Sequence, residues 1–290
     1  MAQITASMVR ELRERTGLGM MDCKKALVEV AGDMDHAIEH LRKSSGLKAA
    51  KKAERVAAQG VVLARLAEDG SRGVLVEVNC ETDFVAKDEN FLAFAEQCLA
   101  AAFADPELDA AALLTGGLDD RRQKLIQKIG ENVNLRRVAH VTADAGGRVG
   151  DYVHGNRRIG VLVSLSGGDE SLARDVAMHV AAMNPLVVRG DDVPQEVLAK
   201  ESEIYAAQAR ESGKPEAIIE KMISGRLRKF VAEVSLLQQP FVKNPDESVG
   251  DLVRGAGADV TRILRYEAGD GMEKKQEDFA AEVAAQLEAG

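Results

Sequence analysis

The chain has 290 residues, enough for two domains or for one domain with appendages, and 46% of them are apolar, so disorder is not the expected state. A formal charge of −9 argues against a general nucleic-acid-binding protein, because neutralising phosphates requires a basic surface. No apolar run approaches the roughly 20 residues of a membrane span and the N-terminus lacks a secretion signal, so we expect a cytoplasmic protein that docks onto a partner.

The first part of the chain has the pattern of three short helices. Thr5 can cap the first helix and Gly17 can end it. A second helix is expected from about Asp22, and Asp33 can cap the third. Because each helix has one apolar face, the pattern predicts a small N-terminal three-helix domain over residues 1–46.

A basic, alanine-rich segment over residues 47–60 follows this domain. Runs of like charge are usually solvated tethers. The segment also lacks the aromatic residues on which single-stranded nucleic acid stacks. We therefore favour a basic linker, and an RNA- or ribosome-binding patch is the alternative.

The middle of the chain contains a weak internal repeat. Gly73-Val-Leu-Val76 recurs as Gly160-Val-Leu-Val163, and each copy has a charged turn before it, a capped helix after it and an edge strand later. A strand–strand–helix–strand unit used twice predicts an α+β fold with two similar subdomains and antiparallel sheets. The expected bounds are 61–142 for the first subdomain, and 143–193 together with 236–269 for the second.

Residues 194–235 interrupt the second subdomain and carry no strand pattern. Pro194 can open one helix and Pro215 another, after a break at Gly213 and Lys214. Two helices of about 20 residues each, joined by a short break, form a helical hairpin about 30 Å long. Its half-apolar surface fits a projecting arm that meets another protein, and fits an ordinary packed helix pair equally well. A C-terminal helical module is expected over 270–290, with an apolar stripe of Phe279, Val283 and Leu287.

The most informative segment, Thr82-Asp83-Phe84-Val85, lies between the first predicted central strand and the helix that follows it. Asp88 or Asn90 can cap that helix. Strand-to-helix corners of this kind present functional side chains on a rigid scaffold. Phe84 is therefore either a contact residue or a buried core residue, which is the usual place of a phenylalanine.

The residue patterns of common catalytic sites are missing from the sequence. It has no phosphate-binding Gly-Lys loop, no His-Glu-x-x-His and no Gly-x-Ser-x-Gly motif, and its three widely spaced cysteines favour neither a disulfide nor a zinc site. Glu81 and Asp83 could form an acid–base pair, which makes an enzyme a further alternative, but no neighbouring base completes a catalytic group. We expect a binding protein without a catalytic residue, a cofactor or a metal.

Several motifs, in this order along nearly the whole chain, resemble the bacterial elongation factor Ts family. They are residues 11–26, Thr82–Lys87, Lys128–Asn132, His154–Gly160, Ser212–Pro215 and Gln239–Val242. The resemblance implies a guanine nucleotide exchange factor for elongation factor Tu in translation elongation. It also implies a ubiquitin-associated-like N-terminal domain, and an antiparallel coiled coil for the helical hairpin.

The resemblance assigns partner-contact residues as well. Thr82, Asp83, Phe84 and Val85 match the motif that enters the switch region of elongation factor Tu and disturbs its Mg²⁺ and phosphate-loop contacts. GDP then leaves, and the exchange factor stays on the nucleotide-free form until GTP binds. The factor itself binds no nucleotide, nucleic acid or membrane, and the resemblance leaves room for a higher-order complex with the partner.

A second contact carries over to the N-terminal domain as Arg13, Met20 and Met21. Two adjacent methionines in a loop between helices would offer an adaptable apolar surface, with core filling as the alternative. His154 matches the histidine of a family turn that also lies toward the partner. This chain has an extra residue there, in Asn156-Arg157-Arg158, so an ordinary turn role is the alternative for His154.

Overall fold

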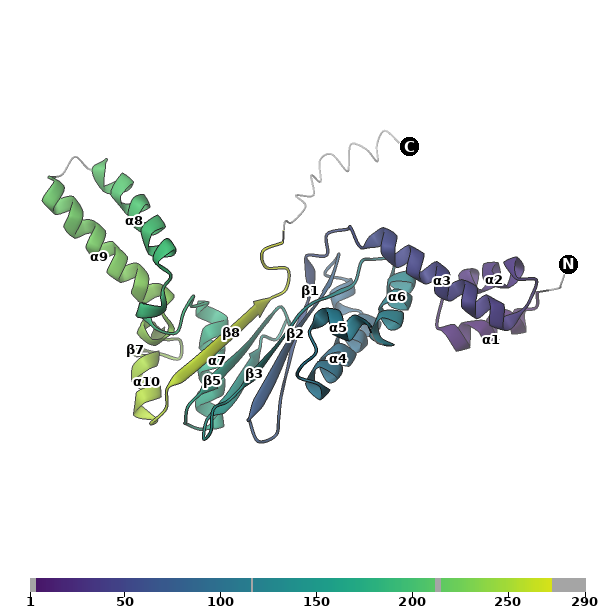
Figure 1. The fold of residues 1–290 in the computed structure, drawn as a ribbon, viewed down its shortest axis with the longest axis horizontal. Coiled ribbons are helices and arrows are strands. Elements are labelled where there is room, and N and C mark those ends of the chain that lie inside the picture. The colour runs from purple at the N-terminus through teal and green to yellow at the C-terminus, as the bar shows by residue number, and fades with distance from the viewer. Residues whose placement is uncertain (1–3, 116, 212–214, 273–290) are drawn as a thin grey trace.

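Two small antiparallel sheets form the centre of the computed structural model, which describes residues 4–115, 117–211 and 215–272. The first sheet has the order β1-β2-β3 and the second the order β4-β5-β8 (Figure 1). The predicted α+β class, with one strand–strand–helix–strand unit used twice, is confirmed. The strands are β1 (Gln59–Leu66), β2 (Arg72–Cys80), β3 (Asn134–Thr142), β4 (Arg148–Val153), β5 (Ile159–Leu165) and β8 (Val260–Glu267).

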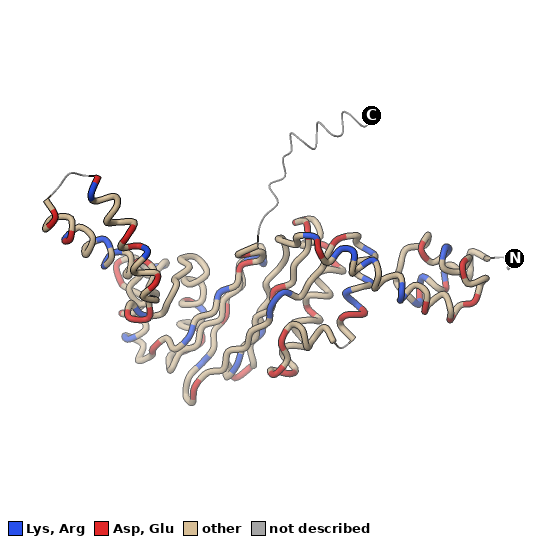
Figure 2. Tube along the Cα trace, turned by 45° about the horizontal axis from the view of Figure 1, so that its top comes forward, with Lys and Arg blue, Asp and Glu red and all other residues tan. Residues whose placement is uncertain are grey.

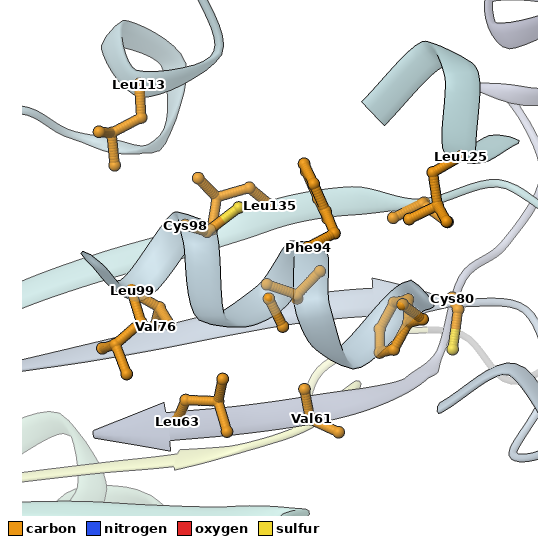
Figure 3. Packing of buried hydrophobic residues seen from close by; sticks show 14 of the residues in the cluster. Val61, Leu63, Val76, Cys80, Phe94, Cys98, Leu99, Leu113, Leu125 and Leu135 are labelled. Atoms are coloured by element: carbon orange, nitrogen blue, oxygen red, sulfur yellow. The ribbon is translucent and has the colours of Figure 1, made fainter. Parts of the chain in front are cut away.

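Three helices cover one face of the first sheet: α4 (Glu89–Ala104), α5 (Ala110–Thr115) and α6 (Gly117–Ile129). Phe94 and Cys98 of α4 lie in the core between this helix and the strands (Figure 3). Of the two residues predicted to cap α4, the N-cap is Asp88. Its Oδ1 accepts hydrogen bonds from the N–H groups of Asn90 (2.8 Å) and Phe91 (3.2 Å). All three cysteines are buried and free.

The second sheet is covered by α7 (Glu170–Met183) and by the short α10 (Val249–Gly255). Between them come the helical hairpin and the small elements that attach it to this unit. These are α8 (Gln195–Arg210), α9 (Glu216–Val234), the 3₁₀ turns η2 (Gly190–Asp192) and η3 (Leu236–Gln238), and the two-stranded sheet of β6 (Pro240–Phe241) and β7 (Asn244–Ser248).

The helical hairpin projects from the core at the end of the molecule opposite the N-terminal helices (Figure 1). Ile204 and Ile218 remain exposed on it. The geometry therefore favours the predicted projecting arm over an ordinary packed helix pair. The break predicted at Gly213 and Lys214 lies outside the described residues, as does the predicted C-terminal helix beyond Met272.

The two sheets pack against each other through their remaining faces. Val62 and Leu75 of the first sheet share an apolar cluster with Leu162 of the second. The glycines of the internal repeat allow this approach: a Cβ on Gly160 would lie 2.5 Å from Val62 Cγ1, and one on Gly73 would lie 3.1 Å from Leu162 Cδ2. Glycine at the start of each central strand is thus required by sheet-to-sheet contact.

A buried carboxylate also joins the two units. Glu77 of β2 is fully buried; its Oε1 accepts hydrogen bonds from Arg136 Nη1 (3.0 Å) and Gly269 N (2.8 Å), and its Oε2 accepts one from Arg137 Nε (2.5 Å). Burial alone raises the pKa of Glu77, but these hydrogen bonds together outweigh it and hold the pKa below its ordinary value. Because Gly269 follows the last strand of the second unit, this contact fastens that unit to the first.

The N-terminal helices are α1 (Ala6–Thr16), α2 (Met20–Glu29) and α3 (Met34–Lys52). The predicted caps are confirmed: Thr5 and Asp33 accept from backbone N–H groups at the starts of α1 and α3, and Gly17 ends α1 in the left-handed region. The predicted start of the second helix is wrong, because Gly19 serves as N-cap with its carbonyl accepting from Cys23 N (3.0 Å). The helix therefore begins two residues before Asp22.

The third helix is longer than predicted. It continues through Lys52, so the predicted linker over 47–60 is helical in its first part. Ser45 and Ala49 are buried where α3 packs against α6, and Lys52 Nζ donates a hydrogen bond to Gly130 O. Alanine-rich sequence favours a helix, and contact with α6 stabilises it. The expectation of a solvated tether is therefore wrong for this part of the segment.

Candidate protein interface

Residues 81–88, called the corner below, connect β2 to α4 by a short hydrogen-bonded turn. They include the 3₁₀ turn η1 (Val85–Lys87). Thr82 organises the turn, because its carbonyl accepts from Ala86 N (3.2 Å) and its Oγ1 accepts from Val85 N (3.3 Å). Val85 is half-buried against the first core. The corner therefore has a defined backbone that can orient its side chains.

Glu131 holds the corner from the end of α6. Its Oε2 accepts the N–H groups of Glu81 and Thr82, both at 3.0 Å, and its Oε1 accepts Thr82 Oγ1–H at 2.6 Å. In return, Glu81 Oε1 accepts Asn132 N–H at 2.6 Å. Sequence reasoning noted residues 128–132 only as a family motif and missed this role of Glu131. The available signal was its place directly after Gly130, where a helix ends and a side chain can reach a neighbouring loop.

The exposed part of the corner consists of an aromatic ring beside an acid. Phe84 is 81% exposed, so the alternative of a buried core residue is wrong. Asp83 forms an ion pair with Lys87 Nζ at 2.7 Å, and this hydrogen bond lowers the pKa of the Asp83 carboxyl. Aromatic side chains are enriched at protein interfaces, so an exposed aromatic ring on an ordered turn is a candidate contact residue. Both side chains are thus accessible to a partner.

Glu81 and Asp83 have separate partners. Glu81 accepts from Asn132 and lies 3.4 Å from Arg55 Nη1, whereas Asp83 pairs with Lys87. Glu81 therefore anchors the corner rather than facing a substrate. Within the described part of the chain, no cluster of three or more His, Cys, Asp or Glu side chains could hold a metal ion.

The N-terminal candidates lie in the last turn of α1 (Arg13) and the first turn of α2 (Met20 and Met21). Met20 and Met21 are 57% and 64% exposed, so the alternative of core filling is wrong for both. Both belong to the first turn of α2, not to the predicted interhelical loop. Arg13 and Met20 line one depression with Lys128 of α6. Lys128 lies in the last turn of α6, and Glu131, which holds the corner, follows that helix, so the end of α6 contacts both candidate regions.

His154 is exposed in the turn between β4 and β5, with its Nδ1 3.0 Å from Asn156 Oδ1. The extra residue is accommodated by Arg157, which adopts a φ of 57°. The carbonyl of Arg157 accepts Val62 N–H at 2.7 Å, which fixes the turn to the first sheet. Arg158 also hydrogen-bonds to Gln59, the β1 residue that pairs with the last residue of β2. The turn therefore lies at the same end of the first sheet as the corner.

Two joined sheets that carry an exposed and anchored corner have the architecture of a protein-binding module. A family model described as Elongation factor TS matches residues 81–270. Curated relatives named Elongation factor Ts include those of Hahella chejuensis (62% identical over 287 residues, 99% of each chain) and Teredinibacter turnerae (59% over 287 residues, 99% of this chain and 98% of the relative). The relative from Saccharophagus degradans is 58% identical over 286 residues, covering 99% of this chain and 98% of its own.

This chain belongs to the elongation factor Ts family. The likeness extends through the N-terminal helices that lie outside the matched part of the family model, because each of these relatives is covered over nearly its whole length. Among the described residues, no helix is both long enough and apolar enough to cross a membrane.

Proposed function

We propose that this protein is a guanine nucleotide exchange factor for elongation factor Tu in translation elongation. Family membership supports this role, and the observation that carries it is Phe84, exposed on a corner that Glu131 anchors. Exchange needs no catalytic residue. A protein that binds the nucleotide-free GTPase more tightly than the GDP-bound form must, by linkage, weaken GDP binding by the same factor.

In this proposal Phe84 and Asp83 act together at the partner's nucleotide site. Phe84 supplies a rigid apolar side chain that enters the switch region. Asp83 supplies a negative group that competes for hydrogen bonds near the partner's Mg²⁺, the large local charge that anchors the β-phosphate of GDP. Disturbing the Mg²⁺ and phosphate-loop contacts releases GDP, and the factor remains bound until GTP enters. Because Glu131 fixes the corner beforehand, little binding energy is lost in ordering it.

The remaining candidates extend the same surface. Arg13, Met20 and Met21 form a second contact, and His154 lies at the matching end of the sheets. The alternative of RNA binding through the basic segment loses part of its support. Lys48 of this segment pairs with Asp22 at 3.1 Å and Lys52 contacts the end of α6, so these charges are used within the fold.

The direct test is the rate at which labelled GDP leaves elongation factor Tu. We expect Phe84→Ala to slow the release promoted by this protein by at least tenfold, or about 1.4 kcal/mol. Leu47→Ala is the matched control, because Leu47 is also a large exposed apolar residue (67%) but lies on α3. Both variants should unfold at the parent's denaturant midpoint. Parent-like release by Phe84→Ala would remove the corner from the mechanism.

A Mg²⁺ titration tests the proposed mode of action. If the corner disturbs the metal site, free Mg²⁺ and this protein compete, so raising Mg²⁺ weakens the complex with GDP-bound elongation factor Tu. The double variant Asp83→Asn, Phe84→Ala should show a flatter Mg²⁺ dependence than the parent. Constant ionic strength keeps general screening out of the comparison. Equal slopes would mean that the corner only anchors the complex.

A further inference from the structure

A ring of contacts lies at the base of the corner, beside the connection between α3 and β1. Asn132 N–H donates to Glu81 Oε1 (2.6 Å), and Asn132 Nδ2 donates to Arg55 O (2.8 Å). Arg55 Nη1 lies 3.4 Å from Glu81 Oε2. Each of these residues thus contacts the other two, and we call them the Asn132 ring (Arg55, Glu81 and Asn132). In Figure 2, positively and negatively charged positions meet in this part of the molecule, where α3 joins the core.

Asn132 is the buried member of the ring, with 5% of its surface exposed. Its Nδ2 also donates to the carbonyl oxygen of Ala53 (3.3 Å), the residue that follows α3. Carbonyl groups at the end of a helix lack helical partners and must be satisfied in another way. An asparagine suits this position, because its amide has two hydrogens for two carbonyl oxygens. Asn132 therefore fastens the start of the α3–β1 connection to the end of α6.

The chain directly after α6 contacts both the corner and the exit of the N-terminal helices. Gly130 ends the helix with a φ of 89°, and its carbonyl accepts from Lys52 Nζ at the end of α3. The next side chain, Glu131, holds the corner, and the one after it, Asn132, holds the α3–β1 connection. A shift of that connection would therefore be passed to Glu81 through the Asn132 ring.

We propose that Asn132 is a positioning residue for nucleotide exchange, which holds the corner in one orientation relative to the N-terminal helices. This inference rests on the proposed function, because the orientation of the corner matters only if Phe84 acts on the GTPase. Asn132 is too deeply buried to contact the partner itself, so its effect must pass through the corner. The loss of its side chain should therefore lower the rate at which the bound factor releases GDP, with little change in affinity.

The test measures GDP release from elongation factor Tu over a range of factor concentrations. We expect Asn132→Ala to lower the maximal rate about fivefold, the scale of one hydrogen bond. The half-saturating concentration should change less than twofold, because the exposed contact residues are untouched.

Asn79→Ala is the matched control. Asn79 is also buried (1% exposed), and its Nδ2 donates to Gln59 O (3.2 Å) and Glu77 Oε1 (3.1 Å), outside the ring. This variant should lose a similar amount of stability to urea but release GDP within twofold of the parent's maximal rate. An equal loss of release in both variants would mean that Asn132 acts only through stability, and would overturn the inference.

A double variant shows whether Asn132 acts through the corner. If it does, Asn132→Ala should slow release less than twofold in a protein that already carries Phe84→Ala, because effects that share one contact do not add. Independent effects would instead multiply. Asn132→Ser, which keeps a polar group, replaces Asn132→Ala throughout if the alanine variant does not fold.

Hydrogen exchange in the free protein gives a readout that needs no partner. In Asn132→Ala the backbone amides of Glu81 and Thr82 should exchange faster than in the parent, whereas those of α7 in the second unit should keep their protection. Unchanged exchange at Glu81 and Thr82 would show that the ring does not hold the corner.

The outcomes separate this inference from the proposed function. A parent that promotes release, together with a folded Asn132→Ala variant of parent-like maximal rate, overturns the inference and leaves the function standing. Losses that multiply in the double variant, or unchanged exchange at the corner, do the same. A parent that does not promote GDP release overturns both.

Discussion

The two strand–strand–helix–strand units share one plan and differ most in the connection from the central strand to its helix. In the first unit residues 81–88 form the corner, with Phe84 exposed. In the second unit residues 166–169 make a short turn, in which Asp169 caps α7 by accepting Leu172 N–H at 2.8 Å. The short connection only reverses the chain. In the proposed function, the longer connection is what gives the first unit a contact surface on the same sheet plan.

The units also differ at one buried position of the repeat. Glu77 follows Gly73-Val-Leu-Val76, and Ser164 follows Gly160-Val-Leu-Val163; both side chains are buried. Only the first unit thus places a charge there, and that charge fastens the second unit to it.

The largest effect is expected from removing this charge. Glu77→Ala leaves Arg136 and Arg137 without their carboxylate and Gly269 N–H without its acceptor, so we expect a loss of about 3–5 kcal/mol in the free energy of unfolding. Ser164→Ala, at the equivalent position, should cost no more than about 1 kcal/mol. Urea unfolding measures both. Similar losses would mean that Glu77 does not join the units.

A second comparison removes one carboxylate from each of the two strand-to-helix connections. Glu131→Ala removes the acceptor of three hydrogen bonds to the corner, and Asp169→Ala removes the cap of the shorter turn. We expect losses of about 1–3 kcal/mol for the first and about 1 kcal/mol for the second. Only Glu131→Ala should also slow GDP release, to nearly the rate seen with Phe84→Ala. Release at the parent's rate would show that the corner keeps its conformation without this carboxylate.

The smallest difference expected between the two units is in their stability at acid pH. His179 of the second unit is buried, with Nδ1 accepting Val242 N–H (3.1 Å) and Nε2 donating to Gln239 Oε1 (2.9 Å), so the ring is neutral. Burial lowers the pKa of His179. The unfolded chain therefore binds more protons in mild acid, and stability falls as the pH drops below the unfolded value of about 6.5. The pKa of Glu77 is also lowered, but its contribution is lost only in the carboxylate range, below an unfolded value of about 4.3.

Hydrogen exchange of backbone amides measures the local stability of each unit separately. On acidification from pH 7 to 5, we expect protection to fall in β5 before it falls in β2. His179→Gln, which cannot gain a charge, should reduce this difference. Asp151 of β4 has the opposite effect on stability: burial raises its pKa, so acidification stabilises the second unit at this residue. Comparing the parent with the His179→Gln variant therefore isolates the contribution of His179. Protection falling first in β2 would contradict the assignment.

The local sequence pattern predicted most of the helices and strands. The features that it missed depend mainly on contacts between residues far apart in the chain. The capped helix expected after Gly160-Val-Leu-Val163 is α7, which Asp169 caps and which has regular apolar spacing. The start of α2 was misplaced because Gly19 caps it through its backbone, without a side-chain signal. The extension of α3 depends on α6, which is far along the chain. The candidate site divides in the same way. The local motif names Asp83 and Phe84, whereas the anchoring by Glu131 rests on contacts between residues 49 and 50 positions apart.

The continuous helix α3 has a consequence for how the two contacts work together. Its 19 residues span about 28 Å, and its second half is docked on α6, so the N-terminal contact and the corner are held at one separation. Two sites joined by a stiff spacer act as a bivalent ligand. The second contact then forms at high effective concentration if the partner presents both sites at that spacing, and adds nothing if it does not. If both proposed contacts engage the partner, a change in the partner's shape becomes a change in avidity, and a flexible tether would blunt that selectivity.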